Sequence, residues 1–237
     1  KKFSEISEAK SGLLTGNDAL FSRYWYEVSD NKTLKKAKNY QEAKLQNKKW
    51  FRITGGGASR KWYGALYSVV NMENDGYAIT HLEGNNYRLR DNKYYFKEGV
   101  NWKLVTSADN SFRLSPKSVV FGNSVRTSFV DNNRYYLALF NSKIIQSVIK
   151  CINPTLNLNN ENVENFPIIE FDFDEQPINK ILSMSKQDWD SFETSWDFKE
   201  HPFITSARWA DRDGEVITIK QAYDDWKGVT EGRFRKL

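Results

Sequence analysis

Short stretches with β-strand character, separated by turn residues, occupy residues 23–124 and constrain the fold more than any other feature. Clusters of Asn, Asp, Gly and Ser between the stretches are typical of turns. Short strands joined in this way pair mainly with antiparallel neighbours. The sequence therefore predicts a twisted, mostly antiparallel β body, with strands expected in RYWYEVS (23–29), KWFRIT (49–54), LYSVVN (66–71), VNWKLVT (100–106), SFRLSP (111–116) and SVVFGNS (118–124).

Helical spacing replaces this pattern after residue 133. In the stretch 134–152, one helix with a single buried stripe is expected, and Pro154 is expected to end it. Its apolar residues are Leu137, Phe140, Ile144, Ile145 and Val148. A short helix is also predicted at 40–47, and VENFPIIEF (163–171) indicates a short strand or extended segment.

The region after Pro177 is expected to be mostly helical. Ser185 is interpreted as a helix cap, and 220–237 as a final amphipathic helix. The predicted fold class is thus α+β, a mostly antiparallel β body with packed helices followed by a helical C-terminal unit. The expected domains are 1–175 and 176–237.

Charge is divided unevenly along the chain. Residues 1–150 carry 25 Lys+Arg and 13 Asp+Glu, a net charge of +12, whereas residues 151–237 carry 10 and 17, a net charge of −7. A basic segment favours an anionic partner such as nucleic acid. We therefore expect DNA to bind the first part. The acidic tail, residues 177–237, is expected to be largely helical and not to grip DNA.

Several kinds of chemistry are missing from the sequence. His81 and His201 have no His or Cys at metal-ligand spacing, and Cys151, expected to be a buried and inert thiol, allows no internal disulfide. No phosphate-binding loop or nucleophile elbow is present. The acidic group Asp172, Asp174 and Glu175 is interpreted as a solvated connector. We predict no catalytic, cofactor or metal site, and the lack of an apolar span or signal peptide predicts a cytoplasmic protein without a membrane partner.

The segment KWFRITGGGASRKWYG (49–64) places three glycines between two aromatic and basic clusters. One interpretation is a loop that follows the DNA backbone and contacts bases. The other is a hairpin turn with core tryptophans and solvated lysines. Glycine allows the flanks to fold back beside each other, so we expect Arg52, Arg60 and Lys61 on one exposed face.

Two further basic sets lie on predicted strands and loops. The first is Arg88, Arg90, Lys93 and Lys97, and the second is Lys103, Ser107 and Arg113. The lysines of 32–38 are expected to form a mobile arm on phosphates. The complete set of predicted DNA-binding residues is Lys48, Arg52, Ser59, Arg60, Lys61, Trp62, Arg88, Arg90, Lys97, Lys103, Ser107 and Arg113. The alternative, based on eight tryptophans and twelve tyrosines, is a protein- or glycan-binding module.

The order of several segments resembles the target-recognition region of PglX-type N6-adenine DNA methyltransferases of BREX phage-defence systems. The resemblance covers most of the chain, and its most specific parts are KWF…GG…RKWYG and DWDSFETSWDF. Other parts are KSGLLTGNDALFSRYWYEV (10–28), RDNKYYFKEGVNWKLVTS (90–107) and LFNSKIIQSVIKCINPTLNLNNENVENFPI (139–168).

The resemblance implies a fragment that selects where such an enzyme acts. The Asn-Pro-Pro-Tyr motif and the glycine-rich S-adenosylmethionine pocket of the family are absent, and NPTL (153–156) lacks the second proline. No catalytic or cofactor residue is therefore transferred to this chain. The implied partners are double-stranded DNA, a catalytic methyltransferase domain of the same protein, other BREX proteins and phage DNA-mimic inhibitors. The start of the chain without Met also suggests a piece of a longer protein.

Overall fold

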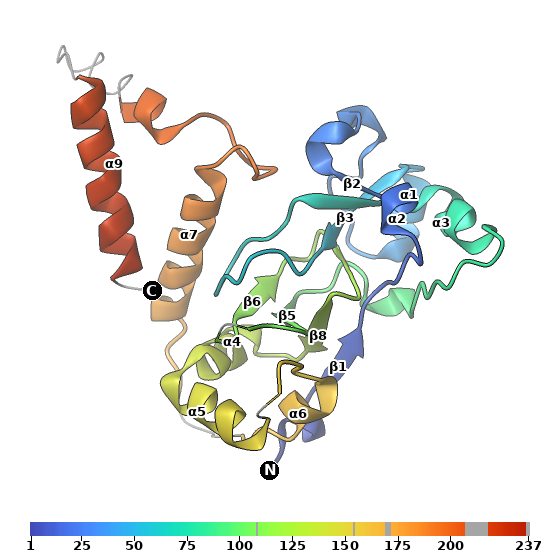
Figure 1. The fold of residues 1–237 in the computed structure, drawn as a ribbon, viewed down its shortest axis with the longest axis horizontal. Coiled ribbons are helices and arrows are strands. Elements are labelled where there is room, and N and C mark those ends of the chain that lie inside the picture. The colour runs from blue at the N-terminus through green and yellow to red at the C-terminus, as the bar shows by residue number, and fades with distance from the viewer. Residues whose placement is uncertain (108, 154, 169–171, 207–217, 236–237) are drawn as a thin grey trace. The chain divides into compact units, whose positions relative to one another are not determined.

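The computed structural model describes residues 1–107, 109–153, 155–168, 172–206 and 218–235 (Figure 1). The chain divides into two compact units, Lys1–Glu175 and Gln176–Leu237. The first unit contains all the strands that the structure describes, and the second is helical.

Two four-stranded sheets build the first unit. The first sheet has the order β1-β8-β5-β6, and every neighbouring pair is antiparallel. The second has the order β2-β4-β3-β7, in which only β3 and β7 run parallel. The α+β, mostly antiparallel fold class is confirmed. The strands are β1 (Glu8–Ser11), β2 (Ser22–Tyr24), β3 (Trp50–Thr54), β4 (Ser68–Asn71), β5 (Gly99–Lys103), β6 (Phe112–Ser115), β7 (Val120–Phe121) and β8 (Val125–Phe129).

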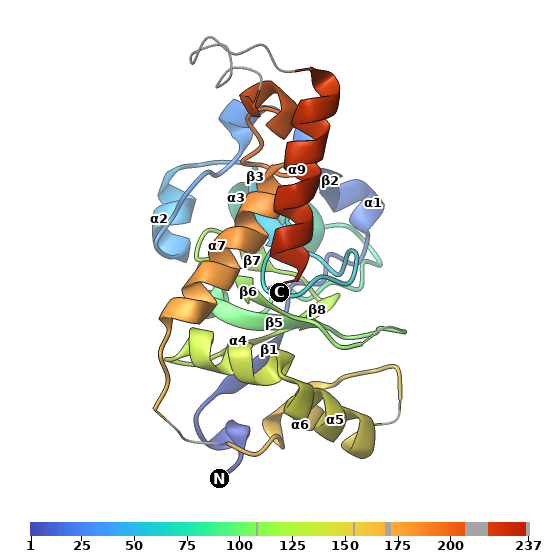
Figure 2. The same cartoon turned by 90° about the vertical axis from the view of Figure 1, so that its left-hand side faces the viewer.

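Helices flank both sheets. Those between residues 133 and 164 lie beside the first sheet, and the three earlier ones lie beside the second (Figure 1, Figure 2). They are α1 (Asp18–Phe21), α2 (Tyr40–Leu45), α3 (Glu73–Thr80), α4 (Asn133–Asn141), α5 (Lys143–Ile152) and α6 (Asn160–Glu164). Short 3-10 helices occupy Phe3–Glu5, Trp25–Glu27, Asp30–Lys32 and Asn92–Tyr94.

The first unit has two apolar centres. One lies against the second sheet. Alternation along β3 places Phe51 and Ile53 on the same face, where they pack in a cluster with Val70 and Phe121. The other is aromatic, and Phe140 of α4 is at its centre, with ring centroids 4.8 Å from Phe3, 5.0 Å from Phe112 and 5.5 Å from Phe166.

The predicted single helix over 134–152 is instead two helices. Ser142 is extended (φ −67°, ψ 152°), and its side chain accepts a hydrogen bond from the Ile145 amide as the N-cap of α5. The break lets α5 bury Ile145 and Ile149 and leave another face outside, with Ile144 64% exposed. Cys151 is exposed, so the prediction of a buried thiol was wrong.

Other local predictions also changed. RYWYEVS is a strand only to Tyr24 and then turns into a 3-10 helix. The 163–171 stretch begins in α6, and its residues 169–171 lie outside the described part. The supposed mobile arm is anchored to the sheet, because Leu34 is buried and its amide donates to the Trp50 carbonyl at 2.8 Å.

The C-terminal unit contains α7 (Gln176–Asp190) and α9 (Ile219–Phe234). Ser185 is buried inside α7. The prediction that it caps a helix was therefore wrong. The unit carries 10 basic and 11 acidic residues, a net charge of −1, because six acidic residues of the second half lie in 161–175. The unit is nearly neutral, so the prediction that its negative charge repels DNA was wrong.

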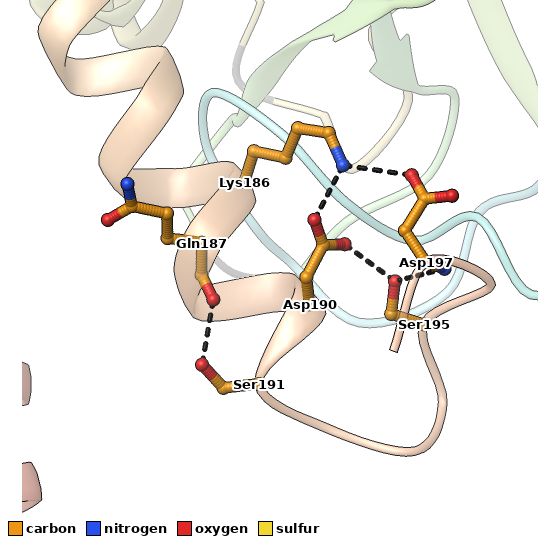
Figure 3. Close-up of polar contacts among 6 residues, drawn as sticks. All are labelled: Lys186, Gln187, Asp190, Ser191, Ser195 and Asp197. Atoms are coloured by element: carbon orange, nitrogen blue, oxygen red, sulfur yellow. Dashed lines mark hydrogen bonds and ion pairs between the residues drawn. The ribbon is translucent and has the colours of Figure 1, made fainter. Parts of the chain in front are cut away.

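A polar network joins the last turn of α7 to the segment that follows it (Figure 3). Lys186 Nζ donates to Asp190 Oδ2 at 2.5 Å and to Asp197 Oδ2 at 2.9 Å. Ser195, which is 2% exposed, donates from Oγ to Asp190 Oδ1 at 2.7 Å. By contrast, Ser191 Oγ donates to the Gln187 carbonyl one turn back, at 2.7 Å, and so lies outside this network.

We expect Ser195→Ala to lower the local stability of this segment by about 1–2 kcal/mol, because it leaves a carboxylate oxygen with one fewer donor. Ser191→Ala is the matched control and should change stability by less than about 0.5 kcal/mol. Amide hydrogen exchange across 186–198 measures both. Equal protection in the two variants would contradict a structural role for the network.

Candidate nucleic-acid interface

The glycine segment crosses from one sheet to the other. On its N-terminal side, β3 belongs to the second sheet. On its C-terminal side, the Trp62 amide donates to the Phe112 carbonyl at 2.9 Å, and the Leu114 amide donates to the Trp62 carbonyl at 2.8 Å, which joins it to β6 of the first sheet. The two flanks therefore do not pair with each other, and the predicted folding back was wrong. We call residues 55–61 the glycine crossover.

Contacts with three neighbouring segments hold the glycine crossover. The Gly56 amide donates to Ser124 Oγ at 2.9 Å, and the hydroxyls of Ser59 and Ser111 are 3.2 Å apart. Gly57 has φ +51°, and a Cβ there would lie 1.8 Å from the Tyr67 hydroxyl oxygen. Gly57 is thus required both by its backbone conformation and by the close approach of Tyr67.

Arg113 lies beneath the glycine crossover. Its Nη2 donates to the carbonyls of Gly55 and Gly56, both at 3.3 Å, and its Nε donates to Asn101 Oδ1 at 3.3 Å. These acceptors are neutral, and burial lowers the pKa of Arg113 to about 10. The side chain therefore acts as an internal anchor for the loop. Its acceptors among the described residues are neutral oxygens, and burying a cation in such surroundings is costly.

Two predicted DNA contacts are corrected by burial. Arg113 is 1% exposed and Trp62 is 8% exposed. Because each side chain packs inside the first unit, neither can reach DNA without a rearrangement. The sequence pattern could not separate them from the surface residues, since Arg113 lies on a strand with both faces covered.

The other predicted residues lie nearer the surface. Arg60 donates from Nε to the Tyr63 carbonyl at 3.1 Å, and Lys48 donates from Nζ to the Asn31 carbonyl at 2.7 Å. Arg52 lies on β3, on the face opposite Phe51. The half-buried members are Lys48, Arg52, Arg60, Lys61 and Lys103, and the exposed members are Ser59, Arg88, Arg90, Lys97 and Ser107.

Three lysines surround the ring of Tyr94. The Nζ atoms of Lys10, Lys93 and Lys97 lie 5.4, 4.9 and 5.6 Å from its centroid. Sequence reasoning missed Lys10, which β1 brings to this cluster, and its place in an unpredicted strand left no signal. The Tyr94 hydroxyl donates to Glu8, and this bond, followed by that from Lys10, lowers the pKa of the Glu8 carboxyl.

Acidic residues reduce the positive charge of this cluster. Lys10 pairs with Glu8 at 3.2 Å, and Lys93 pairs with Asp91 at 3.2 Å. The bond to Asp91 raises the pKa of Lys93. Surface pairs of this kind are weak, so phosphate can compete for these lysines.

A groove of about 610 Å³ lies beside the glycine crossover. Its walls come from both sheets: the segment after β1, strand β2, the end of β3 and the turn between β7 and β8. Tyr24 and Tyr67 line it together with Asn123. Sequence reasoning missed this groove, because its residues are scattered over more than one hundred positions.

Within the described ranges, no group of three or more His, Cys, Asp or Glu side chains is arranged to hold a metal ion. None of the helices in those ranges has the length and apolarity that crossing a membrane requires.

Comparison with known proteins identifies two related methyltransferases, whereas no protein-family model matches the chain. The full chain aligns with the adenine-specific methyltransferase PglX of Lacticaseibacillus casei (strain Zhang), with 30% identity over 246 residues. Of the chain, 84% aligns with the adenine-specific methyltransferase BrxX of Escherichia coli O9:H4 (strain HS), with 37% identity over 204 residues. The chain spans only 20% and 16% of the lengths of these relatives.

Proposed function

Because this chain is homologous to one segment of the PglX and BrxX adenine-specific methyltransferases, we propose that it is the DNA target-recognition part of such an enzyme. In this proposal it grips double-stranded DNA and selects the sequence in which an adenine is methylated for phage defence. Methyl transfer and S-adenosylmethionine binding belong to the part of the enzyme outside this chain.

One observation carries the proposal: the glycine crossover presents Ser59, Arg60 and Lys61 between two sheets on an internally anchored loop. An anchored backbone keeps the side chains in a defined position, which reading a base edge requires. A loop free of anchors would lose more entropy on binding. The buried Arg113 thus supports a role for the loop that a simple turn would not need.

The two basic side chains of the loop suit different tasks. The planar guanidinium of Arg60 can donate two parallel hydrogen bonds to a guanine edge. The ammonium of Lys61 is a compact charge that suits a phosphate, a contact that carries no sequence information. The lysines around Tyr94 would add to the phosphate grip.

We expect Arg60→Ala to weaken binding to the cognate site by roughly 1–3 kcal/mol and to relax the preference there. Lys61→Ala should weaken binding to all sequences about equally and reduce the salt slope by about one. Lys180→Ala, an exposed lysine of the C-terminal unit, is the control and should change neither. The measurement is affinity for cognate and scrambled duplexes across a salt series.

The proposal fails if the unsubstituted chain binds no duplex in a salt-dependent manner, or if both loop variants bind as the control does. A module that binds glycans through aromatic rings would respond little to salt, whereas DNA binding weakens as salt rises. Its aromatic argument is also weakened, because among the seven tryptophans that the structure describes none is exposed, and Trp62, Trp102 and Trp189 are buried.

A further inference from the structure

We propose that the groove beside the glycine crossover binds one unstacked nucleobase, with Tyr24 as its stacking surface. This inference rests on the proposed function and extends it from gripping a duplex to holding a nucleotide that has left the base stack. We call the groove, with Tyr24, Tyr26, Tyr67 and Asn123, the base groove.

An exposed aromatic pair stands at the base groove. Tyr24 lines the groove, and its ring stacks on that of Tyr26, with centroids 5.3 Å apart and an interplanar angle of 14°. The two residues are 49% and 59% exposed. Tyr24 is the last residue of β2, and Tyr26 lies in the 3-10 helix Trp25–Glu27, so the aromatic pair stands where the strand ends.

Tyr67 forms a second aromatic wall. Its ring meets that of Tyr24 edge-on, with centroids 6.5 Å apart and an angle of 77°. Its hydroxyl lies close to Gly57, where an added Cβ would clash with it, so the ring stands beside the glycine crossover. A flat ligand that stacks on Tyr24 would therefore reach the backbone of Gly55, Gly56 and Gly57, where no side chain blocks a close approach.

The charges of the base groove favour a neutral ligand. Its one arginine, Arg23, donates from Nη1 to the carbonyls of Ala19 and Ser22 at 2.7 and 2.6 Å. Its one carboxylate, Asp18, accepts from Thr15 Oγ1 at 2.5 Å. Because both charged groups are engaged and of opposite sign, the groove suits a neutral base better than a phosphate.

Hydrogen-bonding groups suited to a base edge remain in the groove. The side-chain amide of Asn123 makes no hydrogen bond within the described part of the chain, and it offers a donor and an acceptor side by side. An Asn side chain, like that of Gln, can pair with an adenine through two hydrogen bonds. The groove volume of about 610 Å³ falls in the range of small-molecule sites, so a nucleoside fits.

The test uses the full chain and two duplexes that differ in one nucleotide. One is fully paired, and the other carries a single unpaired 2-aminopurine as a bulge. We expect the chain to bind the bulged duplex more tightly and to quench 2-aminopurine fluorescence. Tyr24→Ala should lower the affinity for the bulged duplex roughly five- to one-hundred-fold and the affinity for the paired duplex less than about twofold. Tyr24→Phe should retain the preference for the bulged duplex.

Tyr77→Ala is the matched control. Tyr77 is 58% exposed and its ring stacks on His81, away from the groove residues. Loss of the bulge preference in this variant as well, or its survival in Tyr24→Ala, would overturn the inference. So would equal binding of both duplexes by the unsubstituted chain.

Failure of the proposed function has a different signature. In that case neither duplex binds in a salt-dependent way. A short single-stranded oligonucleotide containing 2-aminopurine then tests the groove alone. Quenching that Tyr24→Ala abolishes would support the base groove, and the absence of quenching would overturn it.

Discussion

Replacing Phe140 with alanine is expected to lower the free energy of unfolding of the first unit by about 3–5 kcal/mol. Phe140 is 1% exposed and lies within 6 Å, between ring centroids, of Phe3, Phe112 and Phe166. These rings belong to the N-terminal 3-10 helix, to β6 and to the segment after α6. Deleting the central ring leaves a cavity that three elements would have to move to fill.

Urea unfolding followed by near-ultraviolet circular dichroism measures this loss. Leu45→Ala is the control, because Leu45 is 86% exposed on α2 and its truncation should cost less than about 0.5 kcal/mol. A similar loss in both variants would show that the aromatic cluster does not hold the helical layer to the sheet.

Gly12→Ala should lower the free energy of unfolding by about 3 kcal/mol, because there is no space for the added carbon. A Cβ at Gly12 would lie 2.2 Å from the carbonyl oxygen of Phe121 and 2.5 Å from the backbone of Gly122. This is the point where the chain leaves β1 and runs beside β7, with the Leu13 amide donating to the Phe121 carbonyl at 2.8 Å. Backbone atoms cannot rotate away as a flexible side chain could, so the segment must shift.

Gly55→Ala gives the comparison within the glycine crossover. A Cβ at Gly55 would meet no atom within 4 Å, and the substitution should change stability by less than about 0.5 kcal/mol. Thermal unfolding of both variants separates the two cases. Because Leu13 and Gly122 also line the base groove, Gly12→Ala should lower the affinity for the bulged duplex more than the affinity for the paired one. An unchanged midpoint in Gly12→Ala would contradict the close approach.

The sequence by itself determined most of the local structure of the β body. Strands β3, β4, β6 and β7 lie inside stretches that were predicted from β-branched and aromatic residues between turn residues, and β5 begins one residue before its predicted stretch. The helix α2 begins after Asn39, whose side chain accepts from the Glu42 amide at 2.9 Å. Signals of this kind act over a few residues, so they can be recognised without the rest of the chain.

Elements with weaker local signals were missed or changed. β1 and β8 were not predicted, and their pairing with each other joins residues more than one hundred positions apart. The helical stretch 134–152 was recognised, but the break at Ser142 was not, because a serine inside an apolar helical pattern can either face solvent or cap a new helix. The packing of α4 and α5 decided between the two.

The candidate site depended still more on tertiary structure. The resemblance to a target-recognition region came from the sequence, together with the glycine segment and its basic flanks. Only the folded chain decided that these flanks join different sheets, that Arg113 and Trp62 are buried, and that Tyr24 and Asn123 share one groove. Alternation along a strand specifies which of its residues share a face. Contacts between distant segments decide which strand lies beside it and whether that face is covered. The free energy of those contacts is not contained in any local sequence pattern.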